Sequence, residues 1–473
     1  MTRPTNTLGF FLKSNAIFGM LSAVAAMAAF LLLPVYTRLF TVEEMAFLGI
    51  LQSCRNILIA IVSFGIPTMI VRFMHDCAND DERRITVRTG FWTALVFSIV
   101  VVVFGIVFGP GVLELMSYEL VDPLAFALML CCVGAYNAIS CGPLALLRSR
   151  LEFKKFAIGN ASVAVLQIGL ILGALFVTDL GVAGVYGGQF AAILIVLSVL
   201  IFDQRRWYGP GYRPALARRM VGTGTPVILN ELSMIYIIWG IVFAAQYFLT
   251  ARDAATMTIV SYVALIFQTV ISRPLAITWW PTHMANRQDV EAATALKARA
   301  VLLVLTLGVG MTVGMAWLGP LMMAPVFGQD YANAAAPATL IGVAMTMAGL
   351  QVFFTGDLII RGQTLRIAGI CLLQMLVASL AWMVLSGPWG NVGIATGTVL
   401  SAASGLALAL ALGEAPVFRR VQSFYCVFAV LNGAVAISAS WVLGGGWPWW
   451  GSAVACLLQF AVTGLVLKHF RPI

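Results

Sequence analysis

Apolar stretches of about 20 residues follow one another along almost the whole chain, and they limit the possible folds more than any other feature of the sequence. A helix needs roughly 20 apolar residues to cross a bilayer. Only 10% of the residues are charged, against about 25% in soluble domains. Fourteen stretches qualify, near residues 15–37, 46–71, 89–109, 123–147, 157–177, 182–202, 221–249, 255–281, 298–318, 333–358, 366–386, 391–412, 423–443 and 446–467.

The sequence therefore predicts an all-α integral membrane protein with about fourteen transmembrane helices. No small-residue cleavage site precedes the first stretch, so we expect it to remain as a membrane span. The distribution of basic residues tests this map, because cytoplasmic loops collect Lys and Arg. Of the 28 Lys and Arg residues, 24 fall in one set of alternate polar segments and only Arg38 and Arg252 in the other.

The segments that hold the 24 basic residues include both ends of the chain, so both termini are predicted to be cytoplasmic. The net charge of +9 then reflects topology and attraction to anionic lipid head groups. It gives no support to nucleic-acid binding.

The two halves of the chain resemble each other when the sequence is shifted by 209 or 210 positions. The equivalent groups are Thr41, Glu44 and Ala46 with Thr250, Asp253 and Ala255; Gly181, Gly184 and Gly188 with Gly390, Gly393 and Gly397; and Gly109 and Pro110 with Gly319 and Pro320. Six predicted helices separate equivalent positions, so both halves have the same orientation. We expect a pseudo-twofold axis along the membrane normal, as in known transporters. The alternative is a duplication retained only for packing.

This repeat predicts the domain organisation. We expect an N-terminal six-helix lobe at residues 1–202 and a second six-helix lobe at 221–412. A basic cytoplasmic linker at 203–220 would join them, and residues 413–473 would add two C-terminal helices.

Two arginines, Arg55 and Arg273, lie inside apolar stretches. A cation exposed to lipid near the middle of a bilayer costs at least ~2.5–3.5 kcal/mol, so each should face the protein interior or a watery cavity. A guanidinium keeps its proton and grips phosphate oxygens with two hydrogen bonds. Arg55 and Arg273 are therefore the candidate cavity cations for an anionic substrate. Glu231 is the only carboxylate near the predicted mid-membrane level, so it is either a counter-ion of Arg55 or an ion-coupling group.

Weaker polar candidates lie elsewhere in the apolar stretches. Those that could bond sugar hydroxyls, or else form hydrogen bonds between helices, are Asn137, Gln167, Gln268, Tyr236 and Tyr262. Prolines also interrupt these stretches, and proline permits a bend. Pro67, Pro226 and Pro274 are therefore candidate hinges, with simple packing kinks as the alternative.

The sequence gives no support to metal or nucleotide chemistry. It contains no H-E-x-x-H, P-loop or G-x-G-x-x-G pattern, and none of its eight cysteines forms a C-x-x-C pair. The predicted outer loops are too short for the catalytic loop of a membrane glycosyltransferase, ligase or polymerase. We therefore expect a transporter without a cofactor rather than an enzyme.

Three segments resemble a known family. "LLRSRLEFKKFAIGNASVAVLQIGLILGAL" with "LGVAGVYGGQ" is similar to the fourth-to-sixth-helix region of polysaccharide transporters. "FLLLPVYTRLFTVEEMAFLGILQS" and "TARDAATMTIVSYVALIFQTVISRPLAITWWP" resemble the first hairpin of each half. The likeness covers roughly residues 10–412. It indicates the multidrug/oligosaccharidyl-lipid/polysaccharide (MOP) exporter superfamily, to which the O-antigen flippases of the Wzx type belong.

The resemblance implies two six-helix lobes that alternate between inward-open and outward-open states in the bacterial inner membrane. The implied cargo is a polyprenyl-diphosphate-linked oligosaccharide, an O-antigen or exopolysaccharide repeat unit, flipped to the outer leaflet. Related flippases have cavity arginines on the second and eighth helices, which Arg55 and Arg273 match by helix. A glycan polymerase and co-polymerase of the same pathway are the implied protein partners. Coupling to a proton or sodium gradient is left open.

Two alternatives remain. One is a multidrug exporter of the same superfamily, although two cavity arginines suit cationic drugs poorly. The other is a membrane-embedded glycan polymerase or ligase.

Overall fold

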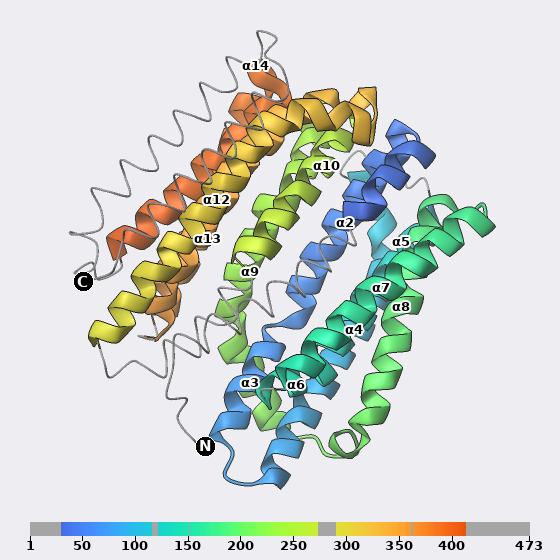
Figure 1. Cartoon of the computed structure of the whole chain (residues 1–473). Helices are drawn as coiled ribbons and strands as arrows, with labels where there is room; N and C mark the ends of the chain where they lie inside the picture. Colours follow the sequence, from blue (N-terminus) through green and yellow to red (C-terminus); the bar gives the residue numbers. More distant parts are fainter. Residues whose placement is uncertain (1–29, 116–121, 151, 273–289, 361–362, 413–473) are drawn as a thin grey trace. The chain divides into compact units, whose positions relative to one another are not determined.

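The computed structural model of the chain describes residues 30–115, 122–150, 152–272, 290–360 and 363–412. Nearly all of these residues are helical, and none of them is in a β-strand (Figure 1). They fall into two compact units. One is formed by residues 40–243, and the other by residues 30–39 together with 244–412. We call them the 40–243 unit and the 244–412 unit.

The 40–243 unit is a bundle in which α5 packs against α2, α4 and α8, and α7 packs against α8. A capping box at Thr41 and Glu44 begins α2, and left-handed conformations at Phe64 and Gly65 separate it from α3. The elements are α2 (Val42–Ser63), α3 (Ile66–Asp76), α4 (Asp80–Leu115), α5 (Pro123–Ile139), the π-helix η1 (Ser140–Leu144), α6 (Ala145–Ser149), α7 (Phe153–Val177), α8 (Gly181–Asp203), the short 3-10 helix η2 (Arg205–Trp207) and α9 (Pro214–Phe248).

The 244–412 unit holds the end of α9 and a set of long apolar helices. In it α13 packs against α12 and α14, and α10 packs against α13. Gln351 and Gln374 join α13 to α14 by a reciprocal pair of buried amide hydrogen bonds, of 3.0 and 2.8 Å. The elements are Phe30–Leu39, α10 (Ala251–Phe267), the π-helix η3 (Gln268–Ser272), α12 (Val290–Phe327), the 3-10 helix η4 (Gln329–Ala334), α13 (Ala335–Ile360) and α14 (Thr364–Leu412).

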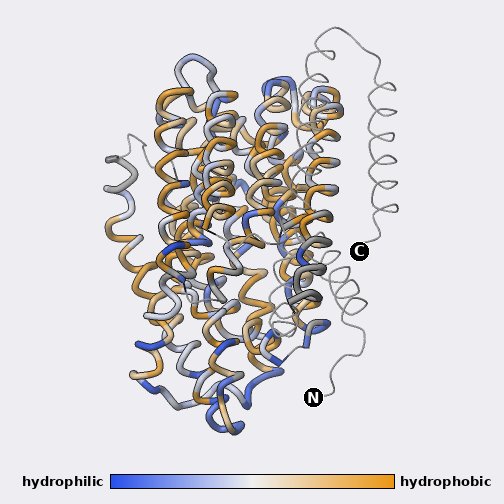
Figure 2. The backbone as a smooth tube through the Cα atoms, turned by 90° about the vertical axis from the view of Figure 1, so that its left-hand side faces the viewer, coloured by the Kyte–Doolittle hydropathy of each residue, from blue (hydrophilic) through white to orange (hydrophobic). Residues whose placement is uncertain are grey.

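Ten helices in the described part of the chain are long and apolar enough to span a membrane. Hydrophobic residues run along the helices and hydrophilic ones gather at their ends (Figure 2). On α4, large side chains such as Val103, Phe104 and Val107 are more than half exposed. Such a face is stable in lipid and unfavourable in water. The fold is thus that of a multi-pass, all-α membrane protein.

The spans agree with the predicted map wherever the structure describes it. The longest helix, α14, covers the predicted stretches 366–386 and 391–412, and its backbone is non-helical at Gly390, where they meet. Of the first predicted stretch, 15–37, only residues from Phe30 onward are described. The last two, 423–443 and 446–467, lie outside the described residues.

The repeat reappears as equivalent local structure. Thr250 caps α10 as Thr41 caps α2, and each threonine Oγ accepts a 3.2 Å hydrogen bond from the backbone N–H three residues later. The helical segment that follows runs over residues 42–63 in one half and 251–272 in the other, an offset of 209 at both ends. The rotation that relates the two halves stays a prediction.

The predicted linker, 203–220, is docked against α4. The Arg88 side chain donates hydrogen bonds to the carbonyl groups of Trp207 and Pro210, of 3.3 and 2.9 Å. Tyr208 donates to Gln204, and burial raises the pKa of its phenol, which keeps it neutral. From Pro214 the segment already belongs to α9. The boundary between the compact units falls between Phe243 and Ala244, inside α9, and the lobes at 1–202 and 221–412 stay predictions.

Candidate anion-binding site

Arg55 lies on α2 inside the 40–243 unit. The capping box fixes the start of α2, and Arg55 follows Val42 by 13 residues, or about 20 Å along the helix axis. It therefore lies well inside the 33-residue apolar span Val42–Met74. Its neighbours Leu51 and Ser53 are fully buried. The helix thus holds a permanent cation within an apolar bundle.

The guanidinium of Arg55 faces α5. Its Cζ atom lies 5.9 Å from the ring centroid of Tyr136, a distance at which an aromatic face attracts a cation. The Arg55 charge also reaches Cys132, one turn earlier on α5. Nε of Arg55 is enclosed and has no hydrogen-bond partner among the described residues, while the side chain as a whole is half-buried. The aromatic ring stabilises this cation only in part, because it does not accept a hydrogen bond from Nε.

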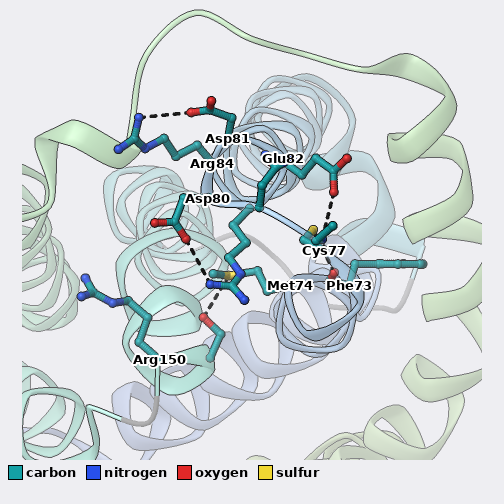
Figure 3. Close-up of polar contacts among 12 residues, drawn as sticks. Phe73, Met74, Cys77, Asp80, Asp81, Glu82, Arg84 and Arg150 are labelled. Carbon is teal, nitrogen blue, oxygen red and sulfur yellow. Dashed lines mark hydrogen bonds and ion pairs between the residues drawn. The ribbon is translucent and has the colours of Figure 1, made fainter. Parts of the chain in front are cut away.

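No carboxylate neutralises Arg55 in the described part of the chain. The ion pairs found there are Arg83–Asp80, Arg84–Asp81, Arg150–Glu152, Lys155–Glu152 and Arg252–Asp330. Figure 3 shows two of them at the turn between α3 and α4, where Arg84 points to Asp81. These are pairs at helix ends, remote in sequence from Arg55.

The charge of Glu231 acts on Arg148 of α6 and on Cys141 of η1, and its role as a counter-ion of Arg55 stays a prediction. The influence on Arg148 follows from the length of the third described span. That span continues through the π-helix to Ser149, so it carries Arg148, which the sequence places in a loop, alongside α9. Whether Glu231 takes part in ion coupling stays a prediction.

The other site candidates in this unit are dispersed. Asn137 is 1% exposed and its amide donates to Ser98 Oγ and to the Ala94 carbonyl, at 2.9 and 3.1 Å. Its hydrogen-bonding capacity is thus used between helices. Gln167 on α7 and Tyr236 on α9 are half-buried, so the three candidates lie on three different helices.

The remaining candidates lie in the 244–412 unit or outside the described residues. Tyr262, on α10, is 6% exposed, and Gln268 begins the π-helix η3 and is half-buried. Arg273 and Pro274 lie outside the described residues. Their roles as cavity cation and hinge stay predictions.

The hinge candidates differ in local structure. Pro67 lies in the first turn of α3, directly after the break at Phe64 and Gly65. At this break the backbone touches α9: a Cβ added to Gly65 would meet the Gly224 carbonyl oxygen at 2.8 Å. By contrast, α9 continues as a helix through position 226. The helix break thus lies beside Pro67, and hinge motion at any of these prolines stays a prediction.

A cavity of about 180 Å³ lies at the end of the same unit. Phe73, Cys77 and Glu82, labelled in Figure 3, line it together with Asp76, Arg213 and Arg219. Charges of both signs face it, so it is not a dedicated anion site. Among the described residues, no group of three or more His, Cys, Asp or Glu side chains could hold a metal ion.

Sequence reasoning missed one polar side chain beside Arg55. Gln52, one turn earlier on α2, is 7% exposed and its Oε1 has no hydrogen-bond partner among the described residues. The three-residue spacing between Gln52 and Arg55 could have indicated it, because residues three positions apart lie on one helix face.

Comparisons with known proteins agree with this architecture. Residues 11–286 match the family described as "Polysaccharide biosynthesis protein". No curated protein sequence gives a match. The solved structures that are similar include the lipid II flippase MurJ in an inward closed conformation, with a TM-score of 0.65 and 10% identity, covering 97% of this chain and 98% of that one.

Multidrug exporters of the MATE family share the fold as well. An outward-facing MATE transporter of the MOP superfamily has a TM-score of 0.63 and 11% identity over 86% of this chain and 95% of that one. The eukaryotic MATE transporter AtDTX14 has a TM-score of 0.62 and 11% identity, covering 92% of this chain and 99% of that one. These neighbours are transporters and flippases, not enzymes. The chain belongs to the polysaccharide biosynthesis protein family and has the fold of the MOP-superfamily transporters.

Proposed function

We propose that the protein is a flippase that moves a polyprenyl-diphosphate-linked oligosaccharide from the cytoplasmic to the outer leaflet of the bacterial inner membrane. The observation that carries this proposal is Arg55, a half-buried cation whose enclosed Nε has no hydrogen-bond partner and which has no carboxylate partner in the described part of the chain. A charge held inside an apolar bundle without a partner is unfavourable. It is best explained by a partner that arrives from outside the protein.

A diphosphate is the chemical partner that fits. Its oxygens accept the paired hydrogen bonds of a guanidinium, which remains charged at every physiological pH. The family match links the chain to polysaccharide biosynthesis, and the neighbour MurJ is named as a flippase of lipid II. The cargo that combines a diphosphate, a lipid and a glycan is a lipid-linked oligosaccharide, such as an O-antigen or exopolysaccharide repeat unit.

The charge of the site separates this proposal from multidrug export. The fold is shared with MATE transporters, so fold alone does not decide the cargo. A cation inside an apolar span repels cationic drugs and attracts anions. Arg273, on sequence grounds, would supply a second cation in the other half.

The transport cycle would be alternating access, with both chain ends in the cytoplasm. Glu231 is the candidate for coupling to a proton or sodium gradient, since a carboxylate beside an arginine can exchange its partner for a cation. The glycan polymerase and co-polymerase of the same pathway would receive the flipped repeat unit.

Export of surface glycan in a flippase-deficient bacterial strain tests the proposal. Arg55→Ala should lower export at least 10-fold with normal expression and membrane insertion. Arg55→Lys should restore part of it, because a point charge loses the paired hydrogen bonds to phosphate. Arg273→Ala should act like Arg55→Ala. The matched control is Arg84→Ala, which breaks only the exposed pair with Asp81.

Full export by the double variant Arg55→Ala, Arg273→Ala would refute the anion mechanism. The two arginines would then be structural groups only.

A further inference from the structure

Gln52 and Arg55 present one unused hydrogen-bond acceptor and one unused donor on the same helix face. Oε1 of Gln52 and Nε of Arg55 are both enclosed and have no hydrogen-bond partner among the described residues. The residues are three positions apart, which places them on adjoining turns of one face with an axial separation of about 4.5 Å. Two residues so close along one helix, one with an unpaired donor and one with an unpaired acceptor, form a candidate binding pair.

The unpaired amide is costly for the protein. Gln52 is 7% exposed, and a buried acceptor left without a partner costs about 1–3 kcal/mol. A leucine of similar size would fill the same space between apolar neighbours without this cost. Buried polar side chains of native proteins are nearly always hydrogen-bonded, so each exception needs an explanation such as a ligand or an ordered water.

We infer that Gln52 and Arg55 form one binding site, in which the Gln52 amide recognises the first sugar of the lipid-linked cargo. This inference rests on the proposed function. Arg55 would bind the diphosphate, and Oε1 of Gln52 would accept a hydrogen bond from a hydroxyl or N–H group of the sugar. The first sugar is bonded directly to the terminal phosphate, so its polar groups lie beside the phosphate oxygens, as Gln52 lies beside Arg55.

The two residues would then have separable tasks. An uncharged amide oxygen adds little attraction for a diphosphate. It does stabilise a bound ligand that places a hydrogen-bond donor opposite it. A site built to hydrogen-bond a substrate group discriminates strongly against an analogue that lacks it. Gln52 should therefore distinguish the glycosylated carrier from the bare carrier, while Arg55 should bind both.

The chain offers a matched control in Gln189 on α8. Gln189 is 8% exposed, and its Oε1 is also enclosed without a partner among the described residues. It lies in the same unit but on a different helix from Arg55. Replacing it by leucine removes an equivalent buried amide without changing the face of α2.

The experiment measures binding of two probes to the purified full-length protein in lipid nanodiscs. The probes are polyprenyl diphosphate and the same lipid carrying N-acetylglucosamine. Gln52→Leu should weaken binding of the glycosylated probe about 10-fold, the effect of one hydrogen bond, and change binding of the bare probe less than about 2-fold. Gln189→Leu should leave both affinities unchanged. If Gln52→Leu does not fold, Gln52→Asn serves as the second variant, because it shortens the side chain by one methylene. It should weaken binding of the glycosylated probe and not binding of the bare probe.

The outcomes separate this inference from the proposed function. Equal weakening of both probes by Gln52→Leu, no weakening of either, or the same selective loss in Gln189→Leu would overturn the inference; no weakening would mean that the amide is satisfied by ordered water. Wild-type binding of the bare probe by Arg55→Ala would instead overturn the anion site, and with it the proposed function.

Discussion

Gly181 and Gly390 lie 209 positions apart, and both have a positive φ, of 51° and 54°. Gly181 begins α8, and Gly390 is the non-helical residue between the two parts of α14. Residues other than glycine rarely adopt positive φ. The shared positive φ therefore explains why both halves have glycine at this position, and it supports the repeat as a structural one.

Substitution of either glycine should destabilise the protein through the backbone alone. A Cβ at Gly181 or Gly390 would meet no atom within 4 Å, so only the positive φ carries a cost, about 1–3 kcal/mol. Gly181→Ala and Gly390→Ala should each lower the free energy of unfolding in detergent by that amount. Gly173→Ala, on α7 and also without neighbours, should instead stabilise by about 0.5–1 kcal/mol. The same sign in all three variants would contradict this explanation.

The contact between α9 and the break after α2 should tolerate no side chain at Gly224. A Cβ there would collide with the carbonyl oxygen of Phe64, whereas a Cβ at Gly222 would meet nothing within 4 Å. Overpacking against a backbone atom typically costs about 1–3 kcal/mol. Thermal unfolding should therefore show a clear loss for Gly224→Ala and little change for Gly222→Ala. Equal stabilities would mean that the two backbones do not touch.

Arg88 should hold the segment between α8 and α9 in place. Arg88→Ala removes the hydrogen bonds to the Trp207 and Pro210 carbonyl groups. Freed from α4, the segment should be cut faster by trypsin at Arg205 and Arg206, by several-fold in a timed digestion. The control variant Arg84→Ala should be cut at the wild-type rate. A wild-type rate for Arg88→Ala would indicate that other contacts are sufficient for docking.

The charge of Glu231 should be coupled to Arg148 and not to Arg55. Because Glu231 is exposed and Arg148 half-buried, the coupling should be modest, about 0.5–1 kcal/mol. A double-mutant cycle of Arg148→Gln and Glu231→Gln, followed by unfolding in detergent, measures it. The matched cycle of Arg55→Gln and Glu231→Gln should give a value near zero. A larger coupling in the second cycle would support Glu231 as the counter-ion of Arg55.

Thiol labelling of intact cells should place the α7–α8 turn outside and the α3–α4 turn inside. Asp179 and Asp80 are exposed in the structure, so Asp179→Cys and Asp80→Cys both present accessible thiols. In a Cys77→Ser background, an impermeant maleimide should label Asp179→Cys at once and Asp80→Cys only after the membrane is opened. Labelling in the reverse order would mean that the topology is opposite to the predicted one.

Much of the fold follows from the sequence, because the hydrophobic length of a span and the charge of a loop are properties of the local chain. The apolar stretches predicted the spans, and the 209-position repeat predicted that Thr250 would cap a helix as Thr41 does, since caps depend on residues three positions apart. The same reasoning applies to Arg55, because the cost of exposing its charge to lipid depends only on its place in the span.

The partners of these residues depended on helix packing, which no local pattern encodes. The extension of a helix through the π-helix η1 to Ser149 brought Arg148 within range of the Glu231 charge, an interaction that no local pattern indicates. Packing of α2 on α5 put Tyr136 against Arg55 and left Oε1 of Gln52 without a hydrogen-bond partner among the described residues. Sequence determined which residues lie in the membrane and at what depth, whereas tertiary structure decided which of them meet, because contacts between helices join residues far apart in the chain.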